Sequence, residues 1–214
     1  MARLKEEITL GMGEVLPRRA LQSVVATLPA WADTDVGTLD VVHVHVLLKS
    51  IERSVKLFGG STTPQLIQKL RACCTGGAAV PAARKRIPVR SDADVLVAQS
   101  TCQQLCSAFF NSTDVVRLAT VVSELARNIY MYAREGEILL EVAEAADGVR
   151  FSVEARDQGP GIANLEHVLS GAYNSRTGLG RGLKGSKALL DGMDVDTGPG
   201  RGTTVRGWKR ARTR

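Results

Sequence analysis

The stretch ARDQGPGIANLEHVLSGAYNSRTGLGRGLKGSKALL, residues 155–190, contains seven glycines and one proline. Glycine loses more conformational entropy on folding than any other residue, so this density is unfavourable in a segment that serves only as core structure. Two parts of the stretch stand out: DQGPG (157–161) ends an alternating apolar run, and GLGRGLKG (178–185) leads into a helical pattern. Both indicate a backbone that a ligand approaches closely.

The sequence around this stretch predicts alternating helices and strands. Apolar residues alternate along EILLEVAEA (137–145) and VRFSVEARD (149–157), and Asp147-Gly148 between them is typical of a tight hairpin. The remaining predicted strands are 84–90, 193–198 and 202–210, and the predicted helices are 92–110, 111–136 and 184–193. Because hairpins dominate this order, we expect an α/β (α+β) two-layer sandwich, with a mixed, mainly antiparallel sheet and helices on one face.

Before this region, the sequence predicts a small all-α segment at 1–77. Pro17 suits a first helical position, Thr38 is a candidate N-cap for a run that stops at Gly59, and Thr63-Pro64 opens another helix. The small residues of TGGAAVPAA (75–83) predict a linker, placed at 78–84. A second domain then covers 85–210, followed by a basic tail at 211–214. The helical segment has no cluster of acids, bases or metal ligands, so we expect a regulatory, docking or dimerisation role, with a purely structural appendage as the alternative.

Composition narrows the class of protein. Apolar residues make up 44% and charged residues 23%, as in ordinary globular domains. No apolar run approaches the roughly 20 residues of a membrane span. Lys5, Glu6 and Glu7 occupy the place of a signal peptide's apolar core, so we expect a cytoplasmic protein with no membrane association. The spacing of the four cysteines, without nearby histidines, predicts free thiols rather than a zinc site.

The net charge of +6 is concentrated in RGWKRARTR (206–214) and in Arg84–Arg86. Such runs bind phosphate backbones in some proteins. Solvated tails and acidic protein partners are commoner explanations, and the runs lack the interleaved aromatic residues of single-strand binders. Nucleic acid is therefore the less favoured partner.

The helix predicted at 111–136, with Ser112 or Thr113 as its cap, has two contrasting faces. Apolar residues share one side: Val115, Leu118, Val122, Leu125, Ile129 and Ala133. Glu124 and Asn128 lie one turn apart on the other side and can point into the same space. Taken alone, this pattern is more typical of a solvated helix face.

Three further signals follow along the chain. Asp157 ends an apolar strand and offers a carboxylate acceptor beside exposed backbone, although taken alone a tight turn is the commoner explanation. GLGRGLKG offers backbone amides at a helix N-terminus, which suits phosphate, but it lacks the setting of a Rossmann or Walker loop. Gly202-Thr203 opens the last strand and offers a hydroxyl.

In this order, the four signals resemble the N box, G1 box, G2 box and terminal GT element of the GHKL ATPases, which share the Bergerat ATP-binding fold. VSELARNIYMYA, DQGPGI and GLGRGLKG are similar to the motifs of the RsbT-type serine-protein kinases. The resemblance covers about residues 85–210 and leaves the first 80 residues unassigned.

The resemblance implies a role for each motif. Asp157 would accept a hydrogen bond from the adenine amino group of ATP, with Thr203 nearby and with Gly159 and Gly161 letting the base approach. Glu124 would be the general base, and Asn128 would hold Mg²⁺. Residues 163–177 would form the ATP lid. The phosphate-side residues would be Gly178, Leu179, Gly180, Arg181, Gly182, Leu183, Lys184 and Gly185, among which Arg181 departs from the small residue expected there.

The resemblance therefore implies an ATP-dependent serine/threonine-protein kinase of the anti-sigma regulatory type. Its substrate would be a STAS-domain protein in a bacterial stress or sigma-factor partner-switching pathway. A sigma factor or a phosphatase as further partner, and a homodimer, stay open. The alternative is an ATP-binding anti-sigma factor that acts mainly by sequestering a protein partner. A sensor histidine kinase is disfavoured, because His43 and His45 lack the sequence context of a phosphoacceptor.

Overall fold

The computed structural model describes residues 4–13, 16, 18–26, 39–57, 82–145, 148–170 and 179–211. The chain divides into two compact units, Met1–Ala82 and Ala83–Arg214. Within the described residues, no helix is both long enough and apolar enough to cross a membrane.

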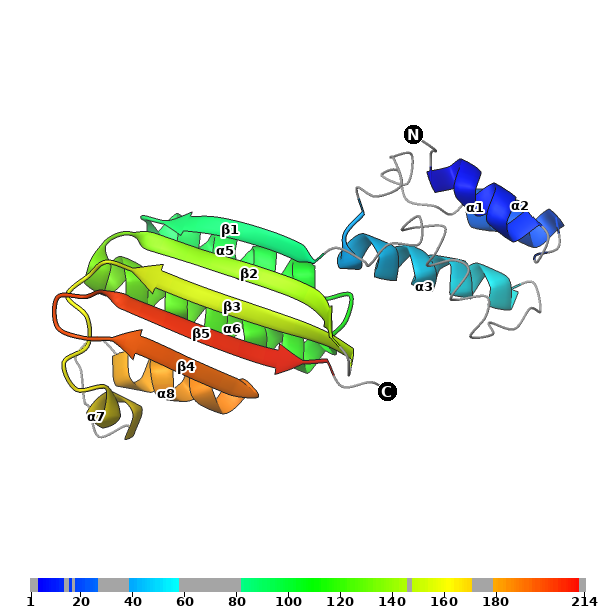
Figure 1. The fold of residues 1–214 in the computed structure, drawn as a ribbon. Helices are drawn as coiled ribbons and strands as arrows, with labels where there is room; N and C mark the ends of the chain where they lie inside the picture. The colour runs from blue at the N-terminus through cyan, green and yellow to red at the C-terminus, as the bar shows by residue number, and fades with distance from the viewer. Residues whose placement is uncertain are drawn as a thin grey trace. The chain divides into compact units, whose positions relative to one another are not determined.

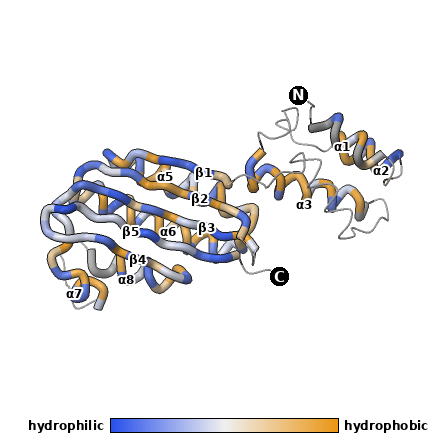
Figure 2. The backbone as a smooth tube through the Cα atoms, viewed as in Figure 1, coloured by the Kyte–Doolittle hydropathy of each residue, from blue (hydrophilic) through white to orange (hydrophobic). Residues whose placement is uncertain are grey.

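The first unit consists of helices in its described part: α1 (Leu4–Gly13), α2 (Arg18–Ala26) and α3 (Val41–Leu57). The tube of α3 is coloured hydrophobic over most of its length in Figure 2. Buried residues from all three helices form one core, which includes Ile8, Met12, Val24, Leu47 and Ile51.

Two sequence predictions for this unit need correction. The helix α1 was not predicted, and the cap of α3 is Asp40 rather than Thr38. The Asp40 carboxylate accepts hydrogen bonds from the backbone N–H groups of Val42 and His43, at 3.0 and 3.1 Å, and thereby satisfies free donors of the first turn. Thr38, Gly59 and the helix expected after Pro64 lie outside the described residues.

The second unit is a five-stranded sheet with helices on one face (Figure 1). Its strands are β1 (Ala83–Val89), β2 (Gly136–Ala145), β3 (Gly148–Asp157), β4 (Gly192–Thr197) and β5 (Thr203–Arg210), in the spatial order β1-β2-β3-β5-β4. The longer helices are α5 (Asp92–Cys106), α6 (Ser112–Asn128) and α8 (Leu179–Leu189), and the short α7 (Leu165–Ser170) precedes α8. The expected two-layer sandwich is confirmed.

All strand pairs of this sheet are antiparallel, where a mixed sheet was expected. Two connections explain the difference. The helical hairpin α5–α6 returns the chain to its starting end, so β2 runs opposite to β1. The crossover through α8 makes β4 parallel to β3, but β5 lies between these two strands and pairs with both.

The buried face of the sheet follows the alternation read from the sequence. Ile138, Leu140 and Val142 of β2 are fully buried, as are Leu118 and Val122 of α6. The opposite face is charged and carries cross-strand ion pairs: Arg84 with Glu141, Arg86 with Glu137 at 2.6 Å and Arg206 with Glu154 at 2.8 Å. Two of the three basic residues of β1 are thus paired within the sheet, an explanation that was not predicted from the sequence.

The strand β1 begins at Ala83, so the last two residues of the linker placed at 78–84 belong to the sheet. Ala83 is buried and pairs with Val142, which extends the strand toward the N-terminus. The loop between β2 and β3 lies outside the described residues, and Gly148 is the first residue of β3 rather than a turn residue.

The cysteines of α5 are free thiols, as expected. Cys102 and Cys106 are buried, with their sulfur atoms 3.9 Å apart. The contact with Cys102, followed by burial, raises the pKa of Cys106 well above its ordinary value. No cluster of three or more His, Cys, Asp or Glu side chains occurs in the described part of the chain.

Candidate functional site

The helix α6 supplies the acid and the amide of the site. Its cap is Asn111 rather than Ser112 or Thr113: the Asn111 side-chain oxygen accepts from the backbone N–H of Asp114 at 2.9 Å. From this start, the helix runs to Asn128 and continues as a π-helical segment, η2 (Ile129–Ala133). Glu124 and Asn128 both line a cleft of about 410 Å³ between α6 and α8, as the helix period predicts.

The end of β3 supplies the carboxylate of the site. Asp157 pairs with Thr203 across β3 and β5, and its Oδ1 accepts from the backbone N–H of Gly159 at 2.9 Å. The side chain is about half buried. Burial raises the pKa of Asp157, while the backbone N–H groups of Gly159 and Thr203 oppose that shift. A carboxyl group held in this way is a directed acceptor for a donor on the ligand.

Hydroxyl groups surround the Asp157–Thr203 pair. The Thr197 Oγ1 lies 3.0 Å from the Thr203 Oγ1, accepts from the backbone N–H of Ile162 at 2.9 Å and donates to the Gly202 carbonyl at 3.0 Å. Thr197 thus connects the end of β4 to the turn after DQGPG. Thr197 was not predicted from the sequence, because only the pairing of β4 with β5 brings it to this place.

The glycines of DQGPG are required by contacts within the protein. Gly161 has φ of +73°, and a Cβ there would be 2.0 Å from the carbonyl oxygen of Gly198. A Cβ on Gly159 would be 2.6 Å from the Cβ of Ala133 in η2. These glycines therefore hold Asp157 against neighbouring backbone, and approach of an adenine base to them stays a prediction.

The sequence GLGRGLKG forms the first turns of α8 rather than a loop. Leu179–Gly185 are helical, whereas Gly178 and the side chain of Arg181 lie outside the described part. Close packing explains the difference: a Cβ on Gly182 would be 2.7 Å from Oε2 of Glu124, so the absent side chain lets α8 lie directly on α6. Each helical glycine costs about 1 kcal/mol relative to alanine, so this turn of helix is inexpensive to unwind.

The three residues of α8 that follow Gly182 differ in what they contact. Leu183 is buried, and the exposed Lys184 donates from Nζ to the carbonyl of Ser170 in α7 at 3.0 Å. Gly185 lines the cleft, with open space where its Cβ would be. The structure therefore brings Gly182 and Gly185 to Glu124 and Asn128, whereas the described contact of Lys184 is with α7.

A smaller inner pocket of about 80 Å³ lies beside the cleft. Asp157, Thr203, Gly161 and Leu183 line it, and Asn128 and Tyr132 line both the pocket and the cleft. Ligand pockets usually measure about 300–1,000 Å³, so this pocket must widen to take up a nucleotide base. Widening requires movement of α8 or of the turn at 160–162, which form one wall.

Two polar atoms at this junction have no hydrogen-bond partner: Nδ2 of Asn128 and Oγ of Ser186. Ser186 is buried, and like Asn128 it lines the cleft. A buried polar atom left unpaired costs about 1–3 kcal/mol, which a polar ligand would recover. Ser186 and Tyr132 were missed from sequence, although Tyr132 follows Asn128 by one helical turn and could have been found by that spacing.

Comparisons with known proteins agree with this geometry. Residues 113–212 match the family described as histidine kinase-, DNA gyrase B-, and HSP90-like ATPase. The chain is 32% identical over 124 residues to the serine/threonine-protein kinase RsbT of Bacillus subtilis, covering 58% of this chain and 93% of RsbT. It is 26% identical over 97 residues to the anti-sigma F factor of Thermoanaerobacter sp. strain X514, covering 44% and 68%. The solved histidine kinase AdeS of Acinetobacter baumannii aligns over 98% of both chains, with 18% identity and a TM-score of 0.37, which is too weak to carry an argument.

The chain therefore belongs to the GHKL ATPase family. Within that family it is of the RsbT-like type, an ATP-using serine/threonine-protein kinase with relatives among the anti-sigma factors. The family, the fold and the kinase class predicted from the motifs are confirmed.

Proposed function

We propose that this kinase transfers the γ-phosphoryl group of ATP to a serine or threonine hydroxyl of a STAS-domain protein in a partner-switching pathway. The proposal rests on one observation: Glu124 and Asn128 line one wall of the cleft, and Gly182 lines the opposite wall. An acid, an amide and close-approach backbone are what transfer at this site would need.

Asp157 and Thr203 would bind the base end of the nucleotide. The adenine amino group would donate to the Asp157 carboxylate, whose orientation the Gly159 N–H fixes. Both residues lie on paired strands, so the base would be held by the rigid part of the unit.

Glu124 would act as the general base. During transfer, the bond between the γ-phosphorus and the bridging oxygen breaks, the bond from the substrate hydroxyl to that phosphorus forms, and ADP leaves. The hydroxyl proton would pass to the Glu124 carboxylate. The closeness of Glu124 to Gly182 supports this role, because it puts the carboxylate beside the segment assigned to the phosphates.

Asn128 fits the Mg²⁺ ion expected in this family. Its Nδ2 has no protein partner, so the carboxamide is free to turn its oxygen toward the cleft. Since the described residues offer no cluster of three acidic or histidine side chains, most ligands would come from phosphates and water, as Mg²⁺ prefers. The ion would neutralise phosphate charge when bound.

The remaining expectations belong to the same proposal. A sigma factor or a phosphatase would be the partner released or retained by phosphorylation, and the site of action would be the cytoplasm. Residues 1–77 would form a helical unit that regulates or recruits, or that mediates a homodimer. The anti-sigma F relatives support one alternative, an ATP-dependent sequestering role.

The test uses the full chain, γ-labelled ATP with Mg²⁺, and purified STAS-domain proteins encoded by the same genome. Transfer of label to a serine or threonine of one such protein supports the kinase. Tight ATP-dependent binding of a partner with no label on it supports the sequestering alternative. Glu124→Gln is the matched control, because it keeps the size of the side chain and removes the base.

A further inference from the structure

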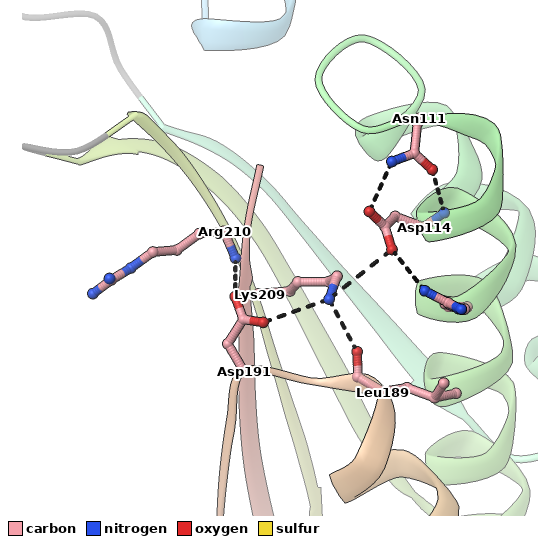
Figure 3. A network of polar contacts seen from close by, with 7 residues as sticks. Asn111, Asp114, Leu189, Asp191, Lys209 and Arg210 are labelled. Atoms are coloured by element: carbon pink, nitrogen blue, oxygen red, sulfur yellow. Dashed lines mark hydrogen bonds and ion pairs between the residues drawn. The ribbon is translucent and has the colours of Figure 1, made fainter. Parts of the chain in front are cut away.

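A cluster of polar groups lies where α6 begins and α8 ends, and its charged side chains are not among those that line the cleft (Figure 3). Lys209 of β5 points from the sheet toward both helices, and its side chain is only 12% exposed. Its Nζ donates to the carbonyl of Leu189 at 3.4 Å and contacts Oδ1 of Asp191 at 3.5 Å and Oδ1 of Asp114 at 4.0 Å. We call Lys209, Leu189, Asp191 and Asp114 the Lys209 cluster.

The carboxylates of the cluster are held by other groups. Oδ2 of Asp114 accepts from the Asn111 amide at 2.9 Å, and its Oδ1 is 3.5 Å from Arg117. Oδ2 of Asp191 accepts from the backbone N–H of Arg210 at 2.8 Å. Lys209 therefore meets two oriented carboxylates instead of flexible surface groups, and the contact with Asp114 has both partners only 12% exposed.

Lys209 also meets the C-terminal end of α8. The last carbonyls of a helix have no partner within the helix and carry partial negative charge, so a cation there is favourable. The next residue, Leu190, is buried and packs so closely on β5 that a Cβ on Gly207 would be 2.5 Å from its Cδ1. The cluster and this packing fix the end of α8 on the sheet.

The fixed end of α8 is the end away from Gly182, and Leu189 there lines the far part of the cleft. The helices α6 and α8 pack antiparallel, with Glu124 against Gly182 at one end and Asp114 near Leu189 at the other. Ten residues separate Asp114 from Glu124, which is about 15 Å of helix. A change in the separation of the helices at the Lys209 cluster therefore reaches the cleft through α6 and through the part of α8 that follows its glycines.

We propose that Lys209 is a positioning residue for phosphoryl transfer: it clamps the end of α8 to the start of α6, so that the glycine-bearing end moves about a fixed pivot. This inference rests on the proposed kinase activity. The base-binding residues Asp157 and Thr203 lie on the sheet and do not depend on the clamp. Loss of the clamp should therefore harm transfer more than ATP binding, because a displacement of about 1 Å can cost 10²-fold in rate.

The experiment compares Lys209→Met with Arg206→Met in the full chain. Arg206 is a cation of the same strand that pairs with Glu154 on the opposite face of the sheet, so it controls for loss of a paired charge. Expected for Lys209→Met is a fall of at least tenfold in kcat, with ATP affinity within about threefold of the parent protein. Lys209→Arg should recover most of the rate, and Asp114→Asn should add little to Lys209→Met because both break one contact.

A readout without transfer keeps the clamp separate from the proposed function. Amide hydrogen exchange of Gly182–Leu189 should be faster in Lys209→Met than in Arg206→Met, whether or not a substrate is known. Should Lys209→Met fail to fold, Asp114→Asn gives the same comparison in milder form, because it removes one carboxylate contact of Lys209. Unchanged exchange of α8, or equal losses of kcat and ATP affinity, overturns the clamp. Absence of transfer by the parent protein, with faster exchange in Lys209→Met, overturns the kinase proposal alone.

Discussion

The two ends of the candidate site are built in opposite ways. Asp157 and Thr203 lie in strand register, so these two residues cannot move apart without breaking the sheet, and the glycines near them are required by close contacts within the protein. The end near Gly182 and Gly185 is a glycine-rich turn of helix, with low intrinsic helix stability. Under the proposed function, the base would be recognised by fixed structure and the phosphates by a segment that unwinds at low cost.

The largest effect on phosphoryl transfer is expected from a change at Glu124, which lies between the two ends of the site. Glu124→Gln should lower phosphoryl transfer by about 10²–10⁴-fold, because general-base catalysis contributes that much. Binding of ATP should stay near the parent value, since the base acts on the substrate hydroxyl. Rate measurements with labelled ATP, together with calorimetric titration, test both parts. If Glu124→Gln transfers phosphate at the parent rate, Glu124 is not the general base and the polar face of α6 is simply a solvated helix face.

The next effect concerns the fixed end. Asp157→Asn should weaken ATP binding by about 10–100-fold, which corresponds to the 1.5–3 kcal/mol of a hydrogen bond to a charged group. The unliganded fold should be as stable or more stable, because burial penalises the charged form of Asp157. Calorimetry and thermal unfolding test the two parts. Equal ATP affinity in the parent and the variant would contradict the adenine assignment.

A smaller effect is expected from alanine substitutions of Gly182 and Gly185 in α8, and the two substitutions should differ in their consequences. In Gly182→Ala the new Cβ would meet the end of the Glu124 side chain, so transfer should fall while stability changes little. In Gly185→Ala the Cβ enters open space, so the free energy of unfolding should rise by about 1 kcal/mol and ATP affinity should fall about fivefold, since unwinding becomes costlier. Denaturant unfolding measures the stability of both variants, and ATP titration measures their affinity for ATP. Identical behaviour of the two would mean that α8 does not rewind.

The smallest effect is on pH dependence. The pKa of Asp157 is raised in the fold, so stability from its protonated form is present below the ordinary value of about 3.9 and is lost as pH rises through the raised value. ATP binding needs the carboxylate and should strengthen over that same rise. Titration of ATP affinity from about pH 4 to pH 7 should show this slope in the parent protein and not in Asp157→Asn. A slope that Asp157→Asn retains would assign the titration to another group.

Short-range patterns made most of the fold predictable. Alternation along 137–145 and 149–157 gave β2 and β3, and the period of 111–136 gave the buried side of α6. The sequence pointed to the wrong caps, Thr38 and Ser112 or Thr113, because Asp40 and Asn111 compete for the same free N–H groups with equal local chemistry. Helix α1 was missed, since its sequence LKEEITLGMG carries glycines where a helix usually does not.

Only those residues of the candidate site that belong to recognisable motifs could be predicted from the sequence. Asp157, Glu124 and Asn128 are marked by strand end and helix spacing, and the structure places them around adjoining hollows. Thr197 and Ser186 carry no local signal, because their relevance depends on the pairing of β4 with β5 and on the packing of α8 on α6. The helical state of GLGRGLKG was also hidden, since it depends on the packing of α8 against α6, which the local sequence does not reveal.

The π-helical segment η2 has a consequence for insertions and deletions in this chain. A π-turn amounts to one residue added to an α-helix, and such additions occur often at functional sites. Deleting one residue between Ile129 and Ala133 would close the π-turn into ordinary α-helix and change the direction in which the remaining side chains of this segment point. Tyr132 would leave the wall shared by the two hollows, and Ala133 would leave its place against Gly159. The number of residues in η2 is therefore constrained by the site as strongly as their identity is.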